Sequence, residues 1–184
     1  MVPKVEVFEH YRGWKPALDL KAAVEGLLAL TPPQYLCGLG SIVLSNSAGL
    51  PHDRRRGVTK ARGKKVVIAN ALGLYHQAWK GQPAWIELLA DNILARLPDW
   101  AWRLAPFRDW ELCTVIFHEL GHHIHATRVP EFRERESVAE DWADKLGEAC
   151  YRQKHPIACG FGFLMNRILR YARSRAPAAT RRVS

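Results

Sequence analysis

Several hallmarks of common protein classes are scarce or missing in this 184-residue sequence. Its four cysteines lie far apart with no CxxC pair, so we expect reduced thiols rather than a disulfide framework. No uncharged apolar run approaches the roughly 18 residues of a membrane-spanning helix. The opening "MVPKVEVFEHYRGW" lacks the basic and apolar segments of a secretory signal. We therefore expect a cytoplasmic protein with no membrane segment.

Acidic residues are absent after Glu148, whereas eight basic residues follow it, and the remaining 19 basic side chains nearly balance the 18 acidic ones. A second basic run, "RRRGVTKARGKK", covers residues 54–65. Such runs are usually solvated loops or tails. The alternative is a weak, sequence-independent contact with nucleic acid through the 54–65 loop and the C-terminal tail. No interleaving of arginine with aromatic residues supports a single-strand groove.

The length suits one domain, which we expect over residues 1–175, followed by a flexible basic tail over 176–184. Hydrophobic periodicity predicts an α+β fold in which a small mixed or antiparallel sheet packs on helices. The expected elements, in chain order, are a strand at 5–8, a helix within 16–32, a strand at 40–47, a polar loop at 49–63, a strand in the first half of 64–76, a strand or helix at 83–94, and helices at 109–128, 132–151 and 157–175.

One stretch concentrates chemistry: "ELCTVIFHELGHHIHATR", residues 111–128, contains an HExxH motif. Asp109 is the expected N-cap of its helix. His118 and His122 are four residues apart, a rotation of about 40°, so both imidazoles leave the same helix face. This spacing suits two nitrogen ligands of one Zn²⁺ ion. Glu119, turned about 100° away, can miss the metal and still reach a metal-bound water.

A third ligand is expected on the following helix, whose stripe of small residues and acids lets it lie close to the HExxH helix. The connection is short, so the two helices should be antiparallel neighbours. A metzincin site is excluded, because His125 and Arg128 stand where that pattern needs Gly and His. The gluzincin pattern, a Glu with a small residue three places later and an acid four places later, is met twice. One match starts at Glu136 in "ESVAE", and the other starts at Glu140 in "EDWAD".

Residues 116–146, with "HELGHHIH" followed by "ESVAEDWADKL", resemble the ImmA/IrrE-like metallopeptidases and the minimal gluzincins. Those families follow the ligand Glu with Ala at +3, an aromatic residue at +6, Ala at +7 and Leu at +10. Counted from Glu136, all four positions match: Ala139, Trp142, Ala143 and Leu146. The resemblance implies a minimal zincin-like fold with Glu136 as the third zinc ligand. It also implies that Glu140 orients a ligand histidine, although the short gap from His122 keeps Glu140 as an alternative ligand.

The function that follows is zinc-dependent hydrolysis of a peptide or protein substrate, with one Zn²⁺ per chain and Glu119 as general base. Candidate stabilisers of the transition state are Tyr75, Tyr151 and His155. We expect His123 on the surface, and His125 is a candidate for a position beside the metal site or the groove. The strand "PAWIELL", residues 83–89, is expected along the cleft, where it could pair with substrate. The alternative function is a zincin-fold binding or regulatory module with weak or no proteolysis, associated with nucleic acid.

Overall fold

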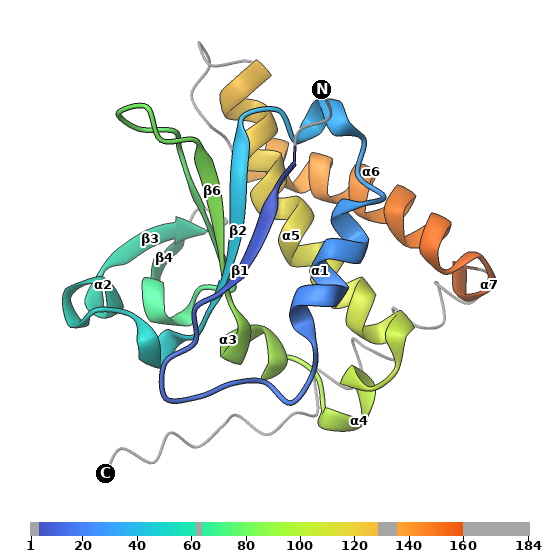
Figure 1. Ribbon diagram of the computed structural model, residues 1–184, viewed down its shortest axis with the longest axis horizontal. Helices are drawn as coiled ribbons and strands as arrows, with labels where there is room; N and C mark the ends of the chain where they lie inside the picture. The colour runs from blue at the N-terminus through green and yellow to red at the C-terminus, as the bar shows by residue number, and fades with distance from the viewer. Residues whose placement is uncertain (1–3, 62–63, 129–135, 160–184) are drawn as a thin grey trace.

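The computed structural model describes residues 4–61, 64–128 and 136–159 (Figure 1). Single turns of 3-10 helix lie at residues 33–35, 47–49 and 68–70. The helices and strands are β1 (Glu6–Glu9), α1 (Leu20–Leu28), β2 (Leu39–Ser45), α2 (His52–Arg56), β3 (Val58–Ala61), β4 (Lys64–Val67), β5 (Gly73–His76), β6 (Ala84–Leu89), α3 (Ala90–Leu94), α4 (Asp99–Trp102), α5 (Ala105–Arg128), α6 (Glu136–Lys154) and α7 (Pro156–Cys159).

The main sheet has four strands in the order β1-β2-β6-β5. The β1–β2 and β2–β6 pairs are parallel, and β5 pairs with β6 in the antiparallel sense. The fold is therefore α+β with a small mixed sheet, which confirms the expected class. The ambiguous stretch 83–94 holds both a strand, β6, and a helix, α3, because its apolar run changes at Ala90 from sheet pairing to helical turns.

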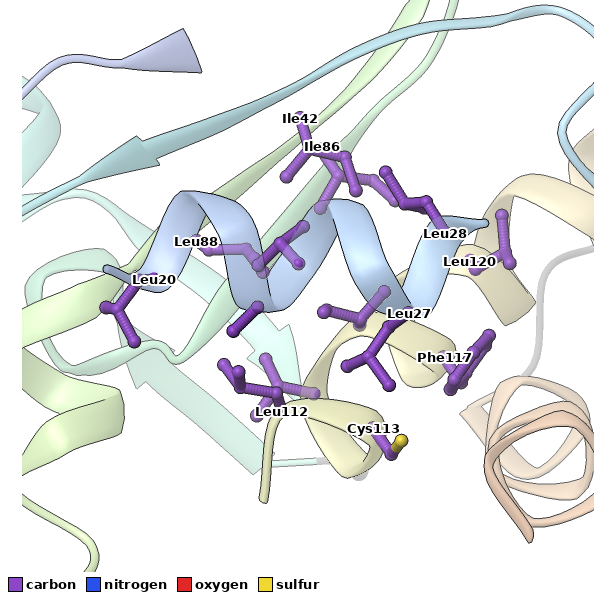
Figure 2. Close-up of a cluster of buried hydrophobic side chains, with 14 of the residues drawn as sticks. Leu20, Leu27, Leu28, Ile42, Ile86, Leu88, Leu112, Cys113, Phe117 and Leu120 are labelled. Carbon is purple, nitrogen blue, oxygen red and sulfur yellow. The ribbon is translucent and has the colours of Figure 1, made fainter. Parts of the chain in front are cut away.

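One face of the sheet carries the hydrophobic core under α1 and α5 (Figure 1). Alternation along the strands sends Ile42 and Leu44 of β2, with Ile86 and Leu88 of β6, into this core. Figure 2 shows leucines of α1 lying between these strand residues and the buried side of α5. Asp19 caps α1 by accepting a hydrogen bond from the Ala22 amide at 2.9 Å. Helix α5 is thus fixed between the sheet, α1 and α6.

The opposite face of the sheet lies on the side of α2 and the β3–β4 hairpin (Figure 1). The prediction of a polar loop over residues 49–63 is wrong, because α2 and β3 occupy most of this range. The strand expected at the start of 64–76 is β4, but it pairs only with β3 within the described chain. The main sheet is instead rejoined by β5, at the end of that stretch. Local periodicity signals a strand but does not say which partner it joins.

Helix α5 begins at Ala105, one turn before the expected N-cap at Asp109. Asp109 is fully buried inside the helix and takes part in three polar contacts instead. Its carboxylate lies 3.0 Å from Arg108 Nε, 3.0 Å from Lys154 Nζ and 2.8 Å from His155 Nε2. Burial would raise the pKa of Asp109, but hydrogen bonds from His155, Lys154 and Arg108 outweigh it and lower the pKa. This cluster ties the end of α6 to the first turns of α5.

The expected helix at 132–151 corresponds to α6, and the expected helix at 157–175 is described only as far as α7. The remaining residues 160–175, and the tail at 176–184, lie outside the described residues. In the described ranges, no helix combines the length and apolarity required to cross a bilayer. Three of the cysteines, Cys37, Cys113 and Cys150, are free thiols, as expected.

Candidate functional site

The HExxH histidines converge on one point beside α5. His118 Nε2 and His122 Nε2 lie 3.2 Å apart, and both rings are partly exposed. Two nitrogens that bind one tetrahedral zinc ion, each at about 2.0–2.1 Å, would be separated by about 3.3 Å. The same distance would suit a hydrogen bond between neutral imidazoles. The separation of the pair is therefore compatible with two ligands of a single metal ion as well as with a hydrogen bond.

Glu119 leaves the helix on a different side and is buried against strand β5. Only 7% of its surface is exposed. A methyl group placed on Gly73 would lie 2.6 Å from Glu119 Cγ and 2.8 Å from its Oε1, so only glycine leaves room for this carboxylate. The base candidate is thus held between the helix and the sheet, next to the histidine pair in sequence but turned away from it.

Helices α5 and α6 touch backbone to backbone at the motif. A methyl group on Gly121 would lie 2.7 Å from the Ala139 carbonyl oxygen and 2.8 Å from Ala139 Cα. Further along, Gly147 of α6 lies beside Phe117 and Cys113 of α5. Because residue numbers rise on α6 as they fall on α5, the helices are antiparallel. The prediction of antiparallel neighbours that approach through small residues is confirmed.

This register brings the two candidate third ligands to the motif. Position 136, the first residue of α6, lies one turn before Ala139, and Glu140 directly follows Ala139. Glu140 is half-buried, and the side chain of Glu136 lies outside the described residues. Among the described side chains, His, Cys, Asp and Glu form no group of three suited to a metal. The positions of both carboxylate residues are within a turn of the Gly121 contact, so both stay candidates.

His123 is fully buried, so the expectation of a surface residue is wrong. Its Nε2 lies 3.0 Å from the Cys37 carbonyl oxygen, which can only accept, so Nε2 carries the proton. Its Nδ1 then accepts from the Tyr75 hydroxyl at 3.3 Å. Burial lowers the pKa of His123, although the hydrogen bond to Cys37 opposes this effect. His123 therefore links three segments as a neutral ring: α5, β5 and the loop before β2.

Of the three stabiliser candidates, the structure brings only Tyr75 to the motif. Tyr151 packs edge-on against Trp110 with ring centroids 5.1 Å apart, and His155 is bound to Asp109. At about 1.5 Å per helical residue, these contacts lie about 12 Å or more along α5 from His118. Tyr75 is on β5, two residues after Gly73, and so shares its face of the strand.

The strand beside α5 is β5 rather than the expected 83–89 segment. β6 is paired on both sides, with β2 and β5, so it has no edge for a further strand. β5 is at the edge of the described sheet, and Gly73 and Tyr75 contact α5 through Glu119 and His123. The expectation for the cleft strand is therefore corrected to β5. His125, expected near the site or groove, is buried with 7% of its surface exposed.

The sequence analysis did not predict the packing roles of two residues, Gly73 and His123. Gly73 stands within the strand-like run "LGLYH", and an isolated glycine in a strand often marks the close approach of another group. That signal was present. His123 gave no such signal, because its burial depends on how the loop at Cys37 packs against the helix. No family model matches the chain, and no curated protein or solved structure matches it.

Proposed function

We propose that this protein is a zinc-dependent peptidase of the gluzincin type, acting in the cytoplasm. The observation that carries the proposal is the 3.2 Å separation of the His118 and His122 Nε2 atoms, which fits two ligands of one tetrahedral zinc ion. A buried carboxylate, Glu119, directly follows His118 in the sequence. Two imidazoles and a neighbouring base are the groups that metal-assisted hydrolysis requires.

His118, His122 and Glu136 would hold the zinc ion. The choice of Glu136 is supported by the contact of Ala139 with Gly121, because Ala139 is the small residue three places after Glu136. For Glu140 the corresponding residue would be Ala143, which is not the residue at that contact. Bound zinc would lower the pKa of a coordinated water and polarise the scissile carbonyl.

Glu119 accepts a proton from the attacking water and delivers it to the leaving amine as the peptide C–N bond breaks. The absence of a side chain at Gly73 leaves the space that this carboxylate occupies. Tyr75, on the same strand, is the remaining candidate to stabilise the negative charge on the carbonyl oxygen. Its hydroxyl proton is directed to His123, so this role requires the hydroxyl to rotate toward substrate.

Strand β5, at the edge of the main sheet as far as the chain is described, is the suggested site for an extended peptide. An edge strand offers unpaired amides and carbonyls that a substrate can match by strand addition. Because Gly73 of this strand contacts Glu119, a peptide paired there would run beside the base. The substrate class that fits is an unfolded segment of a peptide or protein.

Metal content and cleavage test the proposal together. Purified wild-type protein should contain one zinc ion per chain by elemental analysis, and His122→Ala should lose it. Glu119→Gln should keep the zinc but lower cleavage of an unbiased peptide library by about 10²–10⁴-fold. A wild-type protein that takes up no zinc would leave the 3.2 Å contact as a hydrogen bond and overturn the proposal.

The third ligand can be assigned by three matched substitutions on α6. Glu136→Gln should abolish zinc binding, and Glu140→Gln should weaken it by about 10–100-fold, as expected for a group that orients a ligand. Glu148→Gln is the control, because this exposed residue pairs with Arg152 on the solvent side of the same helix. Loss of zinc in Glu140→Gln with retention in Glu136→Gln would reverse the assignment.

A second candidate function is a regulatory module that binds nucleic acid with little proteolysis. The basic run at 54–65 supports it, since its described residues belong to α2, β3 and β4 on the sheet face opposite α5. Retention on DNA that falls steeply with salt and is lost without residues 168–184 would favour this function. An unchanged cellular phenotype in Glu119→Gln would favour it over hydrolysis.

A further inference from the structure

A separate cavity of about 370 Å³ lies on the sheet face opposite the core. Its floor comes from strand residues that alternate with the core residues: Val43 and Ser45 of β2, and Trp85 and Glu87 of β6. Its walls follow the ends of β1 and β2: His10, Arg12, Gly49, Leu50, Pro51 and Arg54. The carboxyl ends of parallel strands are where open sheets commonly bind ligands.

The walls of the cavity are built in place by hydrogen bonds. The Arg12 amide donates to Asn46 Oδ1 at 2.9 Å, and Asn46 Nδ2 donates to the Arg12 carbonyl at 3.0 Å. The stem of Arg12 lies over Gly49, where an added methyl group would be 3.2 Å from Arg12 Cβ. Next to the lining residues Arg54 and Gly49, the Arg55 guanidinium donates to the Ala48 carbonyl. A preformed site needs little ordering on binding.

The floor of the cavity offers one flat aromatic surface. The Trp85 ring stacks on His76 at 3.8 Å between centroids, with only 9° between their planes. His76 therefore covers one face of the indole, and Trp85 also lines the cavity. On the β2 side, the neighbour paired with Trp85 is the small Ser41. Val43, Leu50 and Pro51 add apolar surface, so a planar ring could pack against Trp85.

The charges of the cavity leave an excess of positive groups. The carboxylate that lines the cavity belongs to Glu87. It already accepts hydrogen bonds from Arg54 Nη2 at 2.7 Å and Ser45 Oγ at 3.0 Å. Burial would raise the pKa of Glu87, but hydrogen bonds from His76, Arg54 and Ser45 lower it to about 2. Within the described chain, the side chains of Arg12 and His10 have neither a hydrogen bond nor an ion pair.

We propose that this cavity binds a small phosphate monoester with a flat ring, in the class of a nucleoside monophosphate. Arg12 would bind the phosphate, because a guanidinium presents a planar fork of donors to phosphate oxygens. The ring would lie against Trp85 and Val43. The volume is at the low end of the roughly 300–1,000 Å³ typical of small-molecule sites, which suits a ligand of the size of one nucleotide.

This site is independent of the proposed zinc site, because the cavity and the HExxH helix lie on opposite faces of the main sheet. Isothermal titration calorimetry on the full chain should show AMP and UMP binding once per chain. Adenosine and inorganic phosphate, as separate arms, should each bind at least about tenfold more weakly, since each supplies only half of the contacts.

Three variants assign the binding to the cavity. Arg12→Gln should weaken AMP binding by about tenfold or more, and Val43→Phe, which fills the floor, should remove it. Arg103→Gln is the control, because this exposed arginine follows α4, away from the cavity. Thermal melting would verify that each variant is folded, and zinc content should equal that of the wild type.

Three outcomes would overturn the proposal. They are the absence of saturable AMP binding up to about 5 mM, phosphate binding as tight as AMP binding, and AMP binding that folded Arg12→Gln and Val43→Phe leave unchanged. Because calorimetry reads ligand heat rather than cleavage, a protein without zinc or peptidase activity could still confirm this site. The two proposals therefore fail separately.

Discussion

Gly121 of α5 lies against the backbone of Ala139 of α6, closely enough that a single methyl group would meet the Ala139 carbonyl oxygen at 2.7 Å. The contact falls between the two histidines of the HExxH motif and one turn after position 136. It therefore sets how near a carboxylate of α6 can come to the imidazole pair. A backbone atom cannot rotate away as a side chain could, so the helices would have to separate.

The first prediction is that Gly121→Ala destabilises the fold and weakens metal binding. Separation of the helices should cost about 2–3 kcal/mol of unfolding free energy, in the range of overpacked cores. Gly147→Ala is the matched control in the same helix pair, because its added methyl would find its nearest neighbour, Phe117 Cδ2, at 3.7 Å. That variant should be neutral or more stable by up to about 1 kcal/mol, since alanine favours helix.

Urea unfolding and zinc titration would measure both effects. Equal stabilities for the two alanine variants would contradict the close approach at Gly121. A destabilised Gly121→Ala that keeps the wild-type zinc affinity would support the packing but not its role in placing the third ligand.

The second prediction concerns Gly73, where a methyl group would lie 2.6 Å from Glu119 Cγ. Gly73→Ala should displace the carboxylate while leaving His118 and His122 in place. Cleavage should fall by about 10²-fold, the usual cost of misplacing a reacting group by an ångström. Zinc content should stay at the wild-type level. The Gly147→Ala control should cleave substrate at the wild-type rate. A wild-type cleavage rate in Gly73→Ala would show that the position of Glu119 does not matter.

The parts of this structure that were predictable from sequence depend on local periodicity. The strand at β2, the capped helix α1 and the HExxH helix each carry their own repeat of apolar residues. The spacing of His118 and His122 also fixes their common face without any tertiary information. The antiparallel packing of α5 on α6 followed from a short connection and small residues.

The parts that were not predictable depend on contacts between distant segments. The place of β5 at the sheet edge is decided by its pairing with β6, which no pattern within "GLYH" encodes. Asp109 reads as a helix cap, yet its partners Lys154 and His155 come from the end of α6. The cavity around Glu87 joins residues more than 70 positions apart, from His10 to Glu87.

The third prediction is that His123→Leu destabilises the protein, because His123, the residue after the HExxH motif, is a structural link. The substitution removes the bonds to the Cys37 carbonyl and the Tyr75 hydroxyl inside a buried site. The loss should be about 1–3 kcal/mol of unfolding free energy.

His52→Leu, at an exposed position on α2, should change stability by less than about 0.5 kcal/mol. Tyr75→Phe should lose only part of the His123→Leu effect, because the Cys37 bond remains. If His123→Leu unfolded like the wild type and the His52→Leu control, the contacts of His123 with Cys37 and Tyr75 would not stabilise the fold.

The fourth prediction follows from the pKa of Glu87, which the folded protein lowers from 4.5 to about 2. A carboxylate with a lowered folded pKa stabilises the fold fully above its unfolded pKa, and this stabilisation is lost as the pH falls toward the folded value. Glu87→Gln removes it at every pH. The difference in unfolding free energy between wild type and Glu87→Gln should therefore be large at about pH 6 and shrink steadily between about pH 5 and pH 2. Glu148→Gln, at an exposed site on α6, should change the unfolding free energy little at either about pH 6 or about pH 2. Urea unfolding across this pH range gives the comparison. A Glu87 difference that stayed constant with pH would mean that the carboxylate is not held ionised by Arg54, His76 and Ser45.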